Sequence, residues 1–152
     1  MVRQLNRRWW VAIAIVVIVM IALGLSNYLE RPSEECKPVI AFLDYNKSQG
    51  ELIDSKAGDD DPAVPTQAEE TAYQQWADGL AQRAQEISDP NLAATAIQVA
   101  DAATKFVSLM SRVRIESENH APGTPPPPGY FEMTLINKRI TDGLQQLSDA
   151  CS

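Results

Sequence analysis

The sequence has few of the residues that usually carry catalysis or hold metal ions. It contains one histidine, His120, and two cysteines, which do not make up a four-ligand zinc set. It has no Gly-x-Ser-x-Gly, no His-Glu-x-x-His, no Glu-x-x-His and no glycine-rich phosphate loop. His120 lies in a proline-rich segment without an identifiable orienting partner, so we expect it to be exposed and not a general base. We therefore expect a protein that is not an enzyme, with no cofactor and no metal.

Basic residues are also scarce after the N-terminal segment. Residues 31–152 hold 10 basic and 19 acidic residues, a net charge of −9, although the whole chain has a net charge of −7. Such a surface repels the phosphates of nucleic acids and the headgroups of anionic lipids. Nucleic acid is therefore excluded as an expected partner.

What the sequence does contain is one long hydrophobic run, from Trp9 to Leu25. Continued to residue 29, the run spans about 31 Å as a helix, which matches the hydrocarbon core of a bilayer. Three arginines precede it: Arg3, Arg7 and Arg8. We expect residues 1–8 to be a cytoplasmic basic tail and 9–29 a single transmembrane anchor. The C-terminal domain is then extracytoplasmic, on the periplasmic side.

A cleaved signal peptide is the alternative interpretation of the same run. Gly24 and Ser26 are small enough for cleavage before Asn27, but the run is longer than a usual signal peptide and Ala-x-Ala is missing. The first cysteine, Cys36, follows two glutamates beyond the run, so no lipoprotein acylation site is visible. These features favour the retained anchor.

The cysteines, Cys36 and Cys151, lie at the two ends of the exported part. An even pair in an oxidising compartment predicts a disulfide. Such a bond closes a loop of about 115 residues, for which the chain-entropy account gives an upper figure of about 4–5 kcal/mol. Two free thiols or an intermolecular pair are the alternatives.

Apolar residues at helical spacing predict four helices in the exported part, at about residues 37–55, 66–88, 90–117 and 130–150. Thr66 and Glu69 have the spacing of a capping box, and Asp89 precedes Pro90 as an N-cap precedes a first helical proline. The third helix has the most regular apolar seam: Leu92, Ala96, Val99, Ala103, Phe106, Met110 and Val113. Gly50 weakens the second half of the first helix, which leaves a three-helix bundle as an alternative.

Two segments are expected to be loops. Residues 57–65 include Asp59, Asp60 and Asp61, which lack the spacing of a calcium loop and favour a solvated turn. Residues 119–129 contain Pro125, Pro126, Pro127 and Pro128, which favour a polyproline II rod. The rod, followed by Tyr130 and Phe131, is either an interaction strip or a stiff crossover.

Four antiparallel helices return the end of the chain to its start, which places Cys151 beside Cys36. The predicted fold is therefore all-α: an N-terminal transmembrane helix, then an extracytoplasmic antiparallel four-helix bundle at 36–151, closed by a disulfide. Tyr73, Trp76 and Phe106 point inward at helical spacing, either as core or as the lining of a ligand pocket.

The arginine–tryptophan border of the anchor, the Ala/Asp/Pro-rich helical part and the terminal cysteine pair resemble the small single-pass envelope proteins of high-GC actinobacteria. The resemblance implies an envelope location and an accessory role, and it carries over no functional residues. We expect an accessory or scaffold subunit of an integral membrane protein complex. The alternative is a bundle that binds a small apolar ligand near Trp76 and Phe106.

Overall fold

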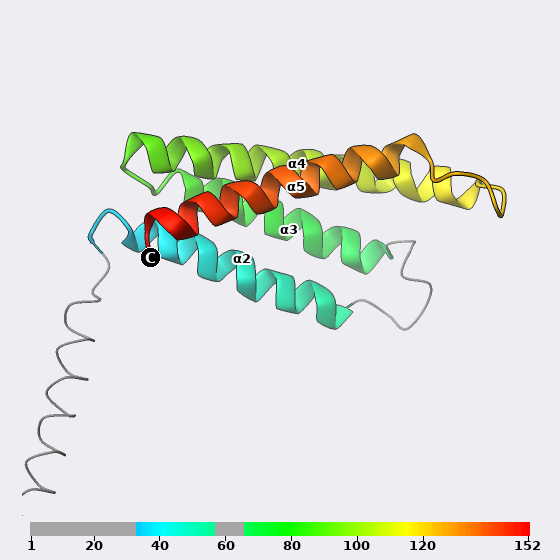
Figure 1. The fold of residues 1–152 in the computed structure, drawn as a ribbon. Coiled ribbons are helices and arrows are strands. Elements are labelled where there is room, and N and C mark those ends of the chain that lie inside the picture. Colours follow the sequence, from blue (N-terminus) through cyan, green and yellow to red (C-terminus); the bar gives the residue numbers. More distant parts are fainter. Residues whose placement is uncertain (1–32, 57–65) are drawn as a thin grey trace, which may run out of the picture. The chain divides into compact units, whose positions relative to one another are not determined.

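The computed structural model describes residues 33–56 and 66–152. This part of the chain is all-α, and each helix runs antiparallel to the one before it (Figure 1). The helices are α2 (Lys37–Lys56), α3 (Gln67–Ala84), α4 (Pro90–Glu118) and α5 (Pro128–Ala150). The predicted four-helix bundle is confirmed. The three-helix alternative is wrong, because α2 continues through Gly50 to its end at Lys56.

Several predicted segments lie outside the described residues. They are the basic tail 1–8, the anchor 9–29, and the loop 57–65 with Asp59, Asp60 and Asp61. Among the residues that the structure describes, no helix is both long enough and apolar enough to cross a bilayer.

The helix starts follow the capping patterns of the sequence. The Thr66 hydroxyl accepts a hydrogen bond from the backbone N–H of Glu69, and the Glu69 carboxylate accepts one from the N–H of Thr66, which completes the predicted capping box. Asp89 accepts hydrogen bonds from the N–H groups of Asn91 and Leu92 at the start of α4. Both N-termini are therefore fixed by local side-chain chemistry.

Two helix limits differ from the expected ones. Helix α3 ends at Ala84 and not at residue 88, because the next N–H groups bond three residues back, as in Ile87 N–H to the Ala84 carbonyl at 3.4 Å. This tighter turn places Ile87 in the core at 5% exposure. Helix α5 begins at Pro128 and not at residue 130, because a proline at the first helical position has no N–H that needs a partner there.

A single apolar core lies between the four helices. Its largest fully buried side chains come from every helix: Val39 and Phe42 of α2, Leu80 of α3, Val99 of α4 and Leu147 of α5. No polar residue among those described is buried, so the core is held by apolar burial and close packing. The seam predicted for α4 is buried or half-buried along its whole length.

A disulfide joins the start of α2 to the end of α5. Cys36 and Cys151 are bonded with their Cα atoms 5.5 Å apart, and they are separated by 115 residues in the sequence. This confirms the predicted bridge and leaves no free thiol in the chain. The bond joins the start of α2 to the end of α5, which lie side by side at the same end of the bundle (Figure 1).

The bundle is uneven in two respects. Helix α4 packs extensively against α3 and α5, whereas α2 contacts α5 only lightly. Helix α4 has 29 residues and α3 has 18, which corresponds to lengths of about 43 Å and 27 Å. The α4–α5 hairpin therefore extends beyond the ends of α2 and α3 (Figure 1). The candidate functional sites described below lie at these two places: the projecting end of the hairpin and the region between α2 and α5.

Candidate functional site

The projecting end of the α4–α5 hairpin, called the tip, contains every residue of the predicted interaction strip. Pro125 and Pro126 are exposed, and Pro127 has the φ of −63° and ψ of 153° that are typical of polyproline II. Pro128 is the first residue of α5, so it is not part of the predicted rod. Pro127 leads directly into the first turn of α5.

The first two turns of α5 present a group of large apolar side chains to solvent. They are Tyr130, Phe131 and Leu135, with exposures of 55%, 56% and 64%, and we call them the tip patch. The rings of Tyr130 and Phe131 pack edge to face with centroids 6.1 Å apart. Leu135 follows Phe131 by one helical turn, so the two share a face. Leu135 was not among the predicted site residues, and it lies outside the buried face that contains Ile136 and Ile140.

Polar contacts join the start of α5 to α4 beside the tip patch. Glu132 lies between the patch residues in sequence, and its carboxylate pairs with Lys105 at 3.5 Å and Arg112 at 3.4 Å. The N–H of Gly129 donates to the Glu116 carboxylate at 3.1 Å. The start of α5 is thus linked to α4 on both sides of the aromatic pair.

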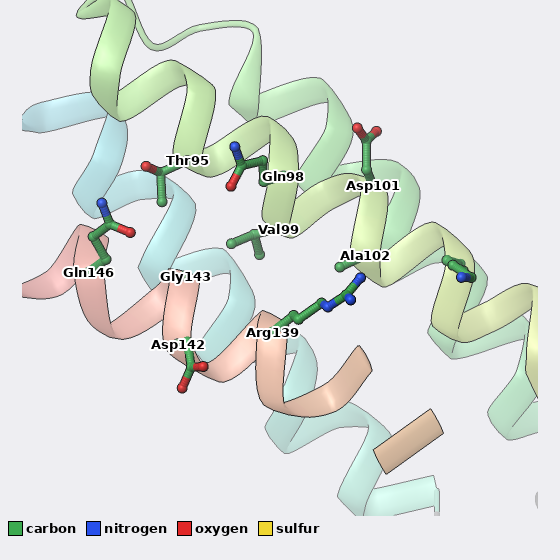
Figure 2. A pocket seen from close by; sticks show the side chains of 10 residues that line it. Thr95, Gln98, Val99, Asp101, Ala102, Arg139, Asp142, Gly143 and Gln146 are labelled. Carbon is green, nitrogen blue, oxygen red and sulfur yellow. The ribbon is translucent and has the colours of Figure 1, made fainter. Parts of the chain in front are cut away.

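A shallow groove of about 560 Å³ runs along the outer side of α4 and α5 (Figure 2). At its floor the two helices approach closely, since a Cβ atom on Gly143 would collide with the Val99 side chain. Its charged lining residues are Lys105, Arg139, Asp101 and Asp142. Two charges of each sign give no net preference for a charged ligand, so this groove is the weaker candidate.

A second hollow, called the cleft, has a volume of about 210 Å³ and lies where α2 and α5 are only lightly in contact. Its wall includes Tyr73, Trp76 and Phe106, the three aromatic residues that the sequence analysis considered as pocket lining. The Tyr73 ring centroid lies 5.9 Å from that of Trp76 and 5.7 Å from that of Phe106. The structure therefore brings this trio together at a solvent-open hollow.

Two polar side chains of α2, Asn46 and Asp54, line the cleft, and Asn46 also orients the Trp76 ring. The indole N–H of Trp76 donates to the Asn46 side-chain oxygen at 2.9 Å, which orients the ring and satisfies its only donor. Burial raises the pKa of the Tyr73 hydroxyl, and the carboxylates of Asp54 and Glu69 raise it further. No sequence pattern indicated the Asn46–Trp76 contact, because it joins residues on different helices.

Tyr45 and His120 make polar contacts outside the tip patch and the cleft. The Tyr45 hydroxyl donates to the Gln75 carbonyl at 2.9 Å, and the Arg83 guanidinium lies 3.7 Å from the centroid of the Tyr45 ring. His120 contacts the Thr124 hydroxyl within its own loop at 2.7 Å. In the described segments no group of three or more histidine, cysteine, aspartate or glutamate side chains is placed to hold a metal ion.

No family model, curated protein or solved structure matches this chain. Function is therefore argued from the tip patch and the cleft themselves.

Proposed function

We propose that this protein is a non-enzymatic, membrane-anchored accessory or scaffold subunit of a larger envelope or membrane protein complex. In this proposal residues 9–29 anchor the chain, residues 1–8 face the cytoplasm, and the bundle lies on the periplasmic side. The resemblance to small actinobacterial envelope proteins agrees with that location. The tip patch is the surface that contacts the partner.

The disulfide supports the proposed compartment. A bond between Cys36 and Cys151 persists in an oxidising space and is rare where thioredoxin and glutathione keep thiols reduced. Two measurements test the topology. The full-length protein should stay in the membrane pellet after alkaline carbonate, and both thiols should react with maleimide only after reduction. Extraction by carbonate, or labelling in intact cells without reduction, would contradict it.

The exposure of the tip patch is the main support for a protein–protein interaction. Three of the large exposed apolar side chains lie within the first two turns of α5, at the end of a projecting hairpin. Tyr130 and Phe131 are 55% and 56% exposed, so each can bury about half of the roughly 150–250 Å² of a whole aromatic side chain against a partner. Phe131 and Leu135 have the one-turn spacing of helix anchors.

The charge of the domain indicates what kind of surface the patch binds. The described bundle is acidic, whereas the patch itself is apolar. The complementary surface is therefore an apolar pocket on another polypeptide, with basic residues around its rim. The polyproline segment beside the patch adds a stiff strip that loses little entropy on contact.

The test uses the full-length tagged protein purified in mild detergent. Phe131→Asp with Leu135→Asp should remove most of a specific co-purifying membrane protein, since charges then face an apolar pocket. Ile97→Asp is the matched control: Ile97 is 45% exposed on the same hairpin. It lies about 12 Å and about 22 Å along α4 from Lys105 and Arg112, the two residues that pair with Glu132 beside the patch. The control should retain the same partner at wild-type level.

Two results would contradict this function. One is a monodisperse wild-type monomer with no co-purifying chain. The other is a partner that is retained by the tip variant, or lost equally from the Ile97→Asp control, since either shows that the patch does not determine binding.

A second function, the binding of a small apolar ligand between the helices, is favoured by one specific observation. The trio of Tyr73, Trp76 and Phe106 lines a solvent-open cleft instead of being wholly enclosed by side chains.

A further inference from the structure

The cleft combines an aromatic wall with charge of a single sign. Of the described residues that line it, Asp54 is the only one with a formal charge, and no lysine or arginine is among them. We propose that the cleft binds a small apolar amine in its cationic form. This inference rests on the second function above and adds the chemical class of the ligand.

The aromatic trio supplies the first reason. An ammonium group is attracted to the electron-rich faces of tryptophan, tyrosine and phenylalanine, and this attraction strengthens as water is excluded. Tyr73 and Trp76 from α3 and Phe106 from α4 lie within one contact network. Trp76 is 8% exposed, so most of its ring is covered by protein, and the small accessible part contributes to the wall of the solvent-open cleft. The apolar body of the ligand packs against Ile53, Ile140 and Leu144.

Asp54 supplies the second reason. Asp54 belongs to α2 and lines the cleft together with the aromatic trio. The negative charge of Asp54 reaches the Tyr73 side chain, because Asp54 is one of the two carboxylates that raise the pKa of Tyr73. A cation in the cleft would gain from this field, and an anion would be repelled. The α4–α5 groove, with its balanced charges, has no such preference.

The volume limits the size of the ligand. The cleft holds about 210 Å³, below the roughly 300–1,000 Å³ of pockets for drug-sized molecules. This is the volume of about seven water molecules, since one water takes up about 30 Å³, so a molecule of fewer than about ten non-hydrogen atoms fits. This is the size of an amine with one ring or a short branched chain, and a long acyl chain or a porphyrin is too large.

Gly50 keeps one side of the cleft open. It lines the cleft within α2, and a Cβ atom built on it meets no other atom within 4 Å. A larger side chain at this position can therefore extend into the empty space without a clash. This gives a variant that blocks the cleft and also raises the helix propensity of α2.

The binding experiment uses the full-length protein in lipid nanodiscs, with Trp9→Phe and Trp10→Phe so that Trp76 is the only tryptophan. Fluorescence of Trp76 is titrated with 2-phenylethylamine, 2-phenylethanol and phenylacetate, which share a body and differ in charge. We expect the amine to bind with a Kd on the order of 0.1 mM. The alcohol should bind several-fold more weakly, and the acid should not bind measurably.

Three variants locate the site. Gly50→Leu should abolish the amine-dependent change, whereas the matched Gly50→Ala should retain it, because a methyl group leaves most of the cleft open. Asp54→Asn should weaken amine binding about threefold to fivefold and leave the alcohol unchanged, since Asp54 is exposed and its field is screened. Added salt should reduce the amine's advantage in the wild-type protein. Far-UV circular dichroism and melting curves verify that each variant is folded.

The outcomes distinguish the ligand-binding function of the cleft from the inference that the ligand is a cation. Equal binding of amine and alcohol, or amine binding that is unchanged in Asp54→Asn, overturns the inference that the ligand is a cation and leaves the ligand-binding function. No binding of any probe, or binding that persists in folded Gly50→Leu, overturns both.

Discussion

At the scale of single residues, glycine can be replaced by a larger residue without a clash in α2 and cannot in α5. Gly50 in α2 and Gly143 in α5 both lie within helices, where glycine costs about 1 kcal/mol relative to alanine. A side chain at Gly50 would meet empty space, whereas one at Gly143 would meet the buried Val99. The sequence shows two helix-weakening glycines and does not distinguish them, because the difference depends on what packs against each.

Gly50→Ala should therefore raise the free energy of unfolding by about 0.5–1 kcal/mol through the backbone alone. Gly143→Ala should lower it by roughly 1–2 kcal/mol, because Val99 is β-branched, stiff and fully buried and has to move. Urea unfolding followed by circular dichroism at 222 nm measures both. Equal shifts in the two variants would show that the close α4–α5 approach at Gly143 is not present.

The candidate site residues were predictable from sequence to different degrees. The cysteine pair was identified by its placement at the ends of the exported part, and the aromatic trio by helical spacing. Leu135 was missed because a single exposed leucine has no signature of its own. Asn46 and Asp54 were missed because nothing in a sequence shows that α2 borders the ring of a residue on α3.

At the scale of elements, helix starts were more predictable than helix ends. Both capping patterns in the sequence correspond to capped N-termini, because a cap is made by residues that are adjacent in the chain. The end of α3 depends instead on Ile87, which leaves the helix to reach the core. Continuation past Gly50 also depended on packing, since Ile53 beyond it is buried at 6% exposure.

Asp89 is the side chain that separates α3 from α4, and its removal tests the value of a cap. Asp89→Ala leaves the N–H groups of Asn91 and Leu92 without their acceptor. The free energy of unfolding should fall by about 1 kcal/mol. Asp101→Ala is the control in the same helix, since Asp101 is exposed in its middle, and its effect should stay within about 0.5 kcal/mol. An equal loss in both variants would mean that the cap is not what stabilises α4.

At the scale of the whole molecule, the disulfide closes a bundle in which α2 and α5 have little other contact. Helices α2 and α5 meet lightly along the cleft, so Cys36–Cys151 is the covalent link between them. The bond stabilises the bundle mainly by restricting the unfolded chain. Helices α2 and α5 are therefore separated along the cleft and covalently joined at Cys36–Cys151.

Reduction of this bond, or Cys36→Ala with Cys151→Ala, should lower the free energy of unfolding by up to about 4–5 kcal/mol. Denaturant titrations of the oxidised protein, the reduced protein and the double variant measure the loss. The reduced protein and the double variant should agree with each other. Identical midpoints with and without the bond would contradict the proposed contribution.

The sequence by itself determined the capping chemistry, since a cap is made by residues close in the chain. It also favoured four helices after the hydrophobic run and an internal disulfide, and the packing of α2 and the Cys36–Cys151 bond decided between these and their alternatives. The tertiary structure decided that the α4–α5 hairpin projects, that α2 and α5 leave a cleft, and that Asp54 borders an aromatic wall. These features follow from relative helix length and from contacts between residues far apart in sequence. Local propensity and periodicity contain no information about such contacts, and so the candidate sites became visible only in the folded bundle.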